Sequence, residues 1–248
     1  PVQFSLGAEG GLTAALNPAA STTSVSIGVN GGSAFDCFGA ACPSLLVTGA
    51  IDHALNLTID SEGNVEISAT GSGLHLENID AAGVVEVPGS GGDAAGSAQS
   101  ILGDLGVQNV VVEGTIDWLW SNGDLGDVTA GNEISYIVVS RQGDLVGNIV
   151  AASIGYMGVD YGSIVSGASV TATDGHIGEV YVMKQLAGSL SAAGSIGRVV
   201  GRKITGTISA GLDVGKMMSR ETHLREYQLR YCGSELRIEG ASITDRKS

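Results

Sequence analysis

The chain has 248 residues, of which 43% are hydrophobic, 15% are charged and 39 are glycine, with 4 prolines and a formal net charge of −14 at pH 7. Because the apolar residues occur in strand-like groups, this composition excludes a disordered chain. No apolar run reaches the length of about 18 residues that a bilayer requires, so we expect no membrane span. The negative charge excludes nucleic acid as a partner.

Charge is distributed unevenly along the chain. Residues 1–140 contain no Lys or Arg but most of the Asp and Glu, whereas all 12 Lys and Arg lie in the remainder. Acidic, lysine-poor, glycine-rich composition is typical of secreted bacterial surface proteins, and it predicts an extracellular or cell-surface location. The acidic first half and the more basic tail also predict that copies associate head to tail into an oligomer.

Residues 1–88 are expected to form an N-terminal β region or cap. Residues 25–29, 55–59 and 65–67 alternate apolar and polar side chains, as half-exposed strands do. Cys37 and Cys42 enclose a four-residue loop that a disulfide would close, with three buried free thiols, Cys232 included, as the alternative. Residues 89–100, rich in glycine, serine and alanine, are expected to form a loop or linker.

Residues 101–215 carry a series of glycines, each followed by a short apolar phrase. Most of them recur at a period of about 20 residues, with one much shorter step. They are Gly103, Gly123, Gly143, Gly162, Gly175, Gly194 and Gly211. A chain that winds in stacked coils must turn at the same place in each coil, where glycine supplies positive φ at little cost. The spacing predicts an all-β parallel β-solenoid (β-helix) with about 20 residues per coil; a β-sandwich is the alternative.

Residues 216–248 hold seven of the twelve Lys and Arg residues and are expected to form a C-terminal coil or cap. Apolar and charged residues alternate here, which favours strands that shield the last coil. A helix from Met217 to Tyr231 is the alternative, because Met217, Leu224 and Tyr231 are spaced by sevens.

In its period and turn chemistry, the region from about residue 100 to 215 resembles the right-handed parallel β-helix proteins. That group includes repetitive passenger regions of bacterial surface adhesins, polysaccharide lyases and hydrolases, and phage tailspikes. The Ile-Gly steps at Ile177 and Ile196 also resemble left-handed hexapeptide solenoids, but a six-residue register fails after Met183. The resemblance implies a non-enzymatic structural or adhesive segment of a surface protein, with a carbohydrate-active enzyme or glycan-binding module as the alternative.

Enzymes of this group combine carboxylates with a basic residue on one exposed sheet. Arg141 is the only cation before Lys184, so the central coils are poorly equipped for an acidic sugar, whereas two carboxylates suffice for a neutral glycan. No nucleophile elbow, P-loop or zinc-protease motif is present, and no residue is identified as catalytic.

Two further patterns bear on binding. Strict alternation places Trp118 and Trp120 on the same side as Ile116, which favours packing in a core or interface over a platform for sugars. An ice-binding face would need repeated Thr-x-Thr, and the ladder holds a single instance, at Thr171 and Thr173.

Asp104, Asp124 and Asp144 each follow a ladder glycine, and their even spacing predicts equivalent turn positions in consecutive coils. Stacked carboxylates about 4.8 Å apart repel each other. Three arrangements relieve the repulsion: the side chains extend into water, each accepts N–H groups of its own turn, or Ca²⁺ binds between them. Ca²⁺ is the only cofactor that the sequence suggests.

Overall fold

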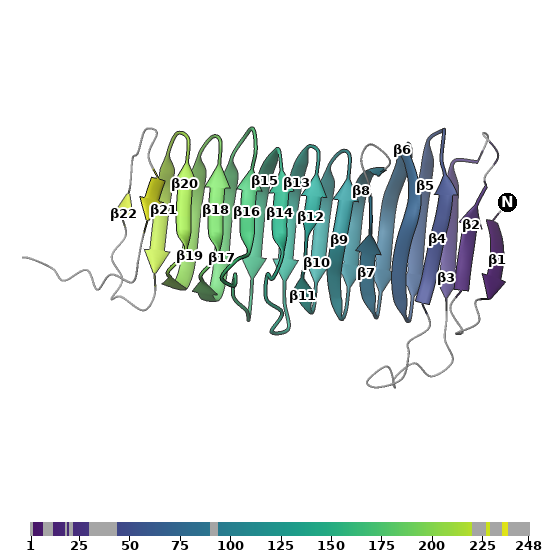
Figure 1. Ribbon diagram of the computed structural model, residues 1–248, viewed down its shortest axis with the longest axis horizontal. Coiled ribbons are helices and arrows are strands. Elements are labelled where there is room, and N and C mark those ends of the chain that lie inside the picture. Colours follow the sequence, from purple (N-terminus) through teal and green to yellow (C-terminus); the bar gives the residue numbers. More distant parts are fainter. Residues whose placement is uncertain are drawn as a thin grey trace, which may run out of the picture.

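The computed structural model describes residues 2–6, 12–17, 19, 22–29, 44–89, 94–219, 227–228 and 235–237. In these residues all regular structure is β-strand, and no helix among them is long and apolar enough to cross a membrane. The strands form one continuous sheet that winds into a parallel β-solenoid of about nine turns, with about 20 residues per turn. Figure 1 shows the elongated molecule, with the strands lying across its long axis. The predicted fold class is confirmed.

The sheet forms two long walls, which we call wall A and wall B. Strands of wall A pair in parallel in this order: β3 (Ser24–Val29), β5 (Leu55–Ser61), the second half of β6 (Asn64–Ala81), β8 (Ala95–Gly103), β10 (Ile116–Ser121), β13 (Glu133–Val139), β15 (Ser153–Val159), β17 (Ile177–Leu186), β19 (Ile196–Ile204) and β21 (Val214–Ser219).

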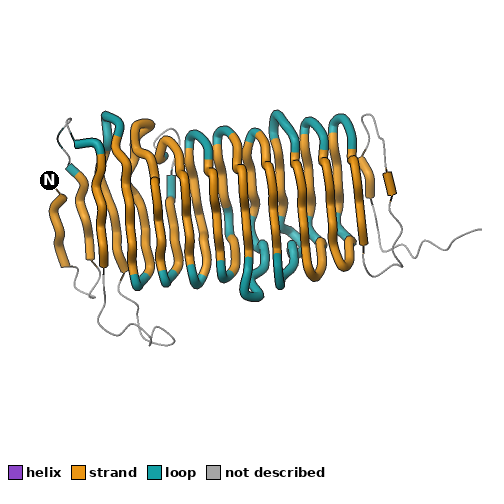
Figure 2. Tube along the Cα trace, turned by 180° about the vertical axis from the view of Figure 1, so that it is seen from behind, coloured by secondary structure: helices purple, strands orange, loops and turns teal. Residues whose placement is uncertain are grey.

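Wall B lies opposite and also pairs in parallel. Its strands are β2 (Leu12–Leu16), β4 (Ser44–Ala50), the first half of β6, β7 (Val84–Val87), β9 (Gly106–Val112), β12 (Val128–Ala130), β14 (Asn148–Ala151), β16 (Ser169–Ala172), β18 (Ser189–Ala192) and β20 (Thr207–Ala210). The two-residue strand β11 (Asp124–Leu125) pairs with β9, and single bridges continue its line through Leu145, Ile164 and Leu186. Figure 2, from behind, shows the loops that join the walls along both long edges.

The core is built from stacked files of aliphatic side chains. In wall A one file runs through Ile116, Ile134, Ile154, Ile177 and Ile196, all buried and in register. Their spacing in the sequence is uneven, so the coils differ in length although the file stays aligned. Burial of one such side chain contributes about 1.5–3 kcal/mol to stability, so the files hold the coils together.

The glycine ladder of the sequence belongs to two different corners of the coil. At one corner Gly123, Gly143 and Gly162 lie one above another, each so close to the carbonyl of the previous coil that a Cβ would clash. At another corner Gly194 lies over Gly175 in the same way. The short step from Gly162 to Gly175 is therefore a change of corner and not a short coil.

Both ends of the solenoid carry antiparallel strands, as expected of caps. The strand β1 (Val2–Leu6) lies antiparallel on β2, and at the other end β22 (Tyr227–Gln228) and β23 (Glu235–Arg237) lie antiparallel on β21 and β20. In the described residues, the alternative helix starting at Met217 is not formed. The parallel winding is already continuous from β4 through β6, and residues 95–100 belong to strand β8, so it begins before residue 101.

Candidate functional site

Most of the exposed aromatic side chains in the described part of the chain lie on the outer face of wall A. Trp118 is 47% exposed and Trp120 is 39% exposed, whereas Ile116 of the same strand is buried. The expectation that the tryptophans share the side of Ile116 is wrong, because Asp117 and Trp118 are both exposed and strict alternation breaks there. The strand bends at Asp117, which has no register partner in the neighbouring strands.

Aromatic rings from three successive coils form a ladder along wall A. Trp118 stacks on Tyr136 with ring centroids 4.4 Å apart and planes 12° apart, and Tyr136 lies 5.5 Å from Tyr156 at a tilt of 36°. A Cβ at Gly158 would meet the Tyr156 ring, so that glycine leaves room for it. Partial burial raises the pKa of Tyr156, and the negative charges of Asp160 and Glu179 raise it further. Trp118 and Tyr136 cover one face of each other, and both side chains remain exposed.

Beside this ladder lies an open depression of about 580 Å³, which we call the Asp104 depression. Its lining combines two carboxylates, two aromatic rings, one cation and smaller groups: Asp80, Leu102, Asp104, Trp120, Asn122, Ser140, Arg141 and Tyr161. They come from wall A strands and from the turns that follow, because these turns stack in register at the same edge of the solenoid.

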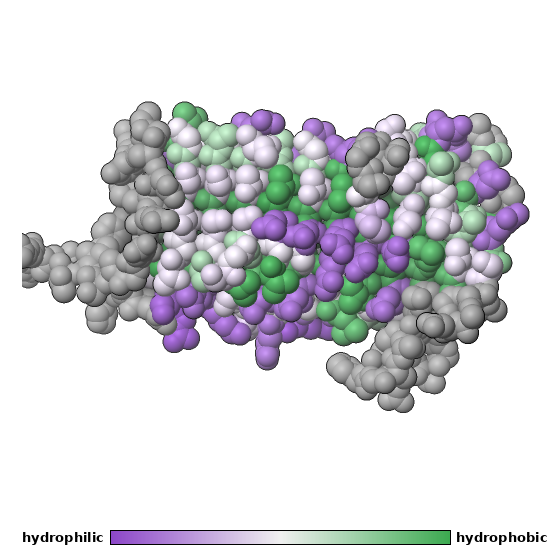
Figure 3. Space-filling view, viewed as in Figure 1, coloured by the Kyte–Doolittle hydropathy of each residue, from purple (hydrophilic) through white to green (hydrophobic). Residues whose placement is uncertain are grey.

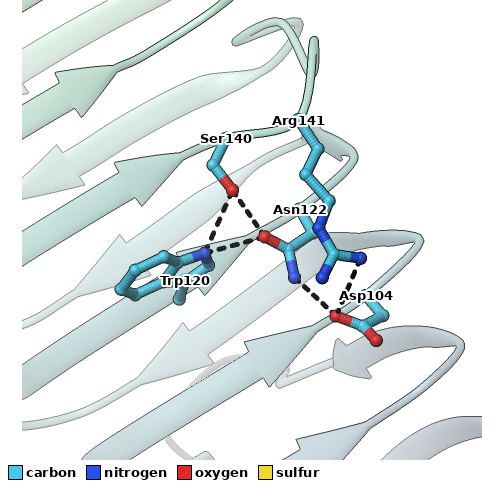
Figure 4. Close-up of polar contacts among 5 residues, drawn as sticks. All are labelled: Asp104, Trp120, Asn122, Ser140 and Arg141. Atoms are coloured by element: carbon cyan, nitrogen blue, oxygen red, sulfur yellow. Dashed lines mark hydrogen bonds and ion pairs between the residues drawn. The ribbon is translucent and has the colours of Figure 1, made fainter.

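A hydrogen-bond network fixes the polar side chains of this depression (Figure 4). Asn122 Nδ2 donates to Asp104 Oδ1 at 2.5 Å, and Ser140 Oγ donates to Asn122 Oδ1 at 2.5 Å. Trp120 Nε1 is shared between Asn122 Oδ1 at 2.9 Å and Ser140 Oγ at 3.2 Å. The indole orientation is therefore set by two acceptors, and Asp104 keeps its second carboxylate oxygen for other partners.

Arg141 reaches the depression from a strained turn. Residues 140–143 form a type I′ turn, since Gly143 N–H donates to the Ser140 carbonyl at 3.0 Å and both Arg141 (φ 49°) and Gln142 (φ 74°) have positive φ. Left-handed backbone costs a non-glycine residue about 1–2 kcal/mol. The guanidinium lies 3.8 Å from Asp104 Oδ1 and is 69% exposed, so this ion pair is weak and Arg141 stays open to a ligand.

The electrostatics of the depression are dominated by carboxylates. Asp60 and Asp80 are register partners in adjacent coils, and Asp104 lies close to Asp80. Partial burial raises the pKa of Asp80, and the negative charges of Asp60 and Asp104 raise it further. Arg141 balances only one of these charges, so the depression suits neutral or cationic groups better than anionic ones.

A second depression of about 470 Å³ lies further along wall A. Its lining is Glu133, Ser135, Tyr136, Gly155, Tyr156, Gly178, Glu179 and Arg198. Arg198 donates a hydrogen bond to Glu179 Oε1 at 2.9 Å, and the two charges compensate each other. This ion pair lies where the aromatic ladder ends. Three residues of its lining, Ser135, Gly155 and Gly178, are small and follow one another in successive coils, so part of it is backbone.

The three aspartates proposed as calcium ligands do not occupy one equivalent position. The coil between Asp104 and Asp124 is 18 residues long and not 20. Asp124 is therefore the register partner of Gly106, and Asp104 lies beside Asn122. Asp124 and Asp144 do stack: Asp124 Oδ1 accepts the N–H of Asp144 at 2.8 Å, and Asp144 Oδ1 accepts that of Ser163 at 2.7 Å. Each carboxylate thus caps the next coil and not its own turn. Within the described residues no group of three or more His, Cys, Asp or Glu could hold a metal ion, and calcium binding stays a prediction.

The remaining sequence candidates contribute little to this site. Cys37, Cys42 and Cys232 lie outside the described residues. His75 Nδ1 lies 2.6 Å from Ser97 Oγ, the distance of a nucleophile and its base, but no acid is hydrogen-bonded to His75 within the described part of the chain. No sequence pattern marked Asn122 or Ser140, whose roles arise from the register of the turns.

Fold and site together define a parallel β-solenoid with an exposed aromatic and polar surface on one wall. No family model matches the chain, and no curated protein or solved structure matches it either.

Proposed function

We propose that this chain is a non-enzymatic adhesive segment of an extracellular surface protein and that it binds a neutral glycan on wall A. One observation carries the proposal: Trp120 and Tyr161, 39% and 57% exposed, line the same depression as the hydrogen-bonding groups of Asp104, Asn122 and Arg141. The acidic, lysine-poor composition supports the extracellular location.

Sugar rings have apolar C–H faces and a rim of hydroxyl groups, and both features have counterparts in the Asp104 depression. Aromatic side chains supply flat apolar area. Because they have few rotamers, they lose little conformational entropy when a ligand binds. Asp80 and Asp104 accept hydrogen bonds, Arg141 donates them, and the Ser140 hydroxyl does both. A uronic acid would face uncompensated carboxylates, which favours a neutral glycan.

One observation favours a second candidate, a glycoside hydrolase. Asp80 and Asp104 line one depression, and their environments differ: the pKa of Asp80 is raised, while Asp104 is hydrogen-bonded to Asn122 and lies near Arg141. Glycoside hydrolases use two carboxyl groups that lie in different environments. Release of reducing sugar from a panel of neutral polysaccharides, abolished by Asp80→Asn, would select this candidate.

Affinity electrophoresis and titration calorimetry with soluble neutral polysaccharides test the proposal. We expect Trp120→Ala and Tyr161→Ala each to weaken binding about tenfold, as loss of an aromatic anchor costs more than about 1 kcal/mol. Leu212→Ala removes an equally exposed apolar side chain outside both depressions and serves as the control. Absence of binding by the unmodified chain, or equal binding by the Trp120 and Tyr161 variants, would refute the proposal.

A further inference from the structure

Asn122, at the centre of the Asp104 depression, is followed by Gly123. The main-chain nitrogen that follows an asparagine can attack the side-chain amide carbon, Cγ, and close a five-membered imide ring. Glycine leaves that nitrogen unhindered, because it carries no Cβ. Asn122 is the only asparagine in the described part of the chain that precedes a glycine, so this chemistry is open to it above all others.

The nitrogen of Gly123 is not engaged by the fold. Gly123 lies in the turn between β10 and β11, and its N–H makes no hydrogen bond to any described residue. The N–H groups around it are held: that of Asn122 donates to the Gly103 carbonyl at 3.0 Å, and that of Leu125 to the Asp144 carbonyl at 2.9 Å. The turn is therefore anchored on both sides of Gly123, and attack by its nitrogen breaks no hydrogen bond.

The side-chain amide of Asn122 is polarised by the hydrogen-bond network of the depression. Its Oδ1 accepts hydrogen bonds from Ser140 Oγ and Trp120 Nε1 (Figure 4). Attack at Cγ moves negative charge onto Oδ1, and these two donors stabilise that charge as an oxyanion hole does. On the other side of the amide, Nδ2 donates to the Asp104 carboxylate, which stabilises positive charge on the departing nitrogen.

We propose that Asn122 is a self-modification site, at which the folded chain promotes loss of its own side-chain amide. The Gly123 nitrogen forms a bond to Asn122 Cγ, and its proton is transferred to Nδ2. The bond between Cγ and Nδ2 then breaks with its electron pair on nitrogen, and ammonia leaves. Water opens the imide at one of its two carbonyl carbons and leaves either aspartate or its β-linked isomer at position 122. Water is the only co-reactant.

Either product changes the depression in which it forms. A carboxylate in place of the Asn122 amide has no N–H to donate to Asp104, so two carboxylates face each other where Asp80 already adds negative charge. The β-linked product also lengthens the main chain by one atom within a turn that stacks in register. The reaction therefore disrupts the network irreversibly, and it removes the glycan-binding surface where that proposed function holds.

A second Asp–Asn–Ser arrangement provides an internal control. Asn148 Nδ2 donates to Asp127 Oδ1 at 3.2 Å, and Asn148 Oδ1 accepts from Ser169 Oγ at 2.7 Å. Asn148 lies on strand β14 of wall B, in a strongly hydrophilic part of the face that Figure 3 shows. The residue after it is Ile149, which is buried, β-branched and inside the strand. Asn148 thus has similar side-chain partners but no unhindered nitrogen, and it should keep its amide.

The experiment incubates the full chain at neutral pH, folded and in parallel unfolded in urea. A protease that cleaves after glutamate then separates the two asparagines, since residues 114–133 carry Asn122 and residues 134–179 carry Asn148. Mass spectrometry follows the small mass increase that accompanies replacement of the amide by a carboxyl group. We expect Asn122 to react at least about tenfold faster in the folded chain than in urea, because only the fold supplies the two donors to Oδ1.

Two variants test the role of the network. Ser140→Ala removes one donor to Oδ1 and should slow the reaction of the folded chain about tenfold, without changing the rate in urea. Ser195→Ala, in a turn of a later coil, should change neither rate. A folded chain that reacts no faster than the unfolded chain would overturn the proposal, and so would equal rates for the two variants. No glycan is present in this experiment, so its outcome is independent of the proposed function.

Discussion

Walls A and B are built from the same coils, yet their outer faces differ over the last coils. Inside, both present stacked Ile, Leu, Val and Ala residues to one core. Outside, wall A carries aromatic rings and charges, whereas the last coils of wall B carry only small uncharged groups. The inward files hold the coils together and tolerate little change, while the outward files are free to acquire a function. The following predictions test this division, from the largest expected effect to the smallest.

The largest effect should come from an inward file. Ile154→Ala removes a fully buried side chain of wall A and should lower the free energy of unfolding by about 2–5 kcal/mol. Thr171→Ala, on the outer face of wall B, should change it by less than about 0.5 kcal/mol. Urea denaturation followed by circular dichroism measures both. Similar losses in the two variants would contradict the division between inward and outward files.

The next effect concerns Gly155, Gly178 and Gly197, which lie one above another in successive coils of wall A. A Cβ at Gly178 would clash with the Gly155 carbonyl of the previous coil, so Gly178→Ala should cost about 1–3 kcal/mol. Gly28 has no neighbouring atom within 4 Å of that position, and Gly28→Ala is the matched control, with an expected change below about 0.5 kcal/mol. If both variants melt at the temperature of the unmodified chain, close approach of the coils does not constrain this position.

A smaller effect is expected at the carboxylates that cap the next coil. Asp144→Ala leaves the Ser163 N–H without its acceptor and should destabilise the chain by about 1 kcal/mol. Asp144→Asn keeps an oxygen acceptor and should recover part of this loss. Asp174 is exposed and its side chain makes no hydrogen bond to a described residue, so Asp174→Ala is the control. Thermal unfolding that ranks Asp174→Ala as the more damaging change would refute the capping role.

The smallest effect is the pH dependence of Asp80. Since its pKa is raised in the folded chain, folding favours the protonated carboxyl, and the ionised form costs stability at pH values above the ordinary value of 3.8. Asp80→Asn should therefore stabilise the chain at pH 7 by less than about 1 kcal/mol, and the gain should disappear as the pH falls below 3.8. Melting temperatures from pH 3 to pH 8 measure it. A gain that persists at pH 3 would contradict its origin in the ionised carboxyl, which is disfavoured first by partial burial and then by the charges of Asp60 and Asp104.

The winding of the chain could be predicted from the sequence, because coil length is set by turns that need glycine and by inward files that need aliphatic residues. The corners could not be told apart, since Gly143 and Gly175 look alike in the sequence and differ only in which carbonyl of the previous coil they approach. The misalignment of Asp104 with Asp124 has the same origin, because consecutive coils of unequal length shift the register.

The site was harder to predict than the fold. Strict alternation placed Trp118 and Trp120 on the side of buried Ile116, although both are exposed. The small residues that recur at this position in later coils, Gly155, Gly178 and Gly197, were the signal that alternation breaks there. Arg141 stood out in the sequence as a lone cation. Its pairing with Asp104 could not be predicted, because it depends on which turns stack on each other. Calcium binding and head-to-tail association stay predictions. The antiparallel strands at both ends cover backbone edges on which end-to-end pairing would depend.

The most direct test of the central claim uses the two tryptophans, which are the only ones in the chain and both lie on wall A. Acrylamide quenching of tryptophan fluorescence is measured with and without a bound neutral polysaccharide. We predict that the polysaccharide reduces quenching in the unmodified chain and in Thr171→Ala, and much less in Tyr161→Ala. Polysaccharide binding that leaves tryptophan quenching unchanged would place the ligand elsewhere and contradict the assignment of wall A as the glycan-binding surface.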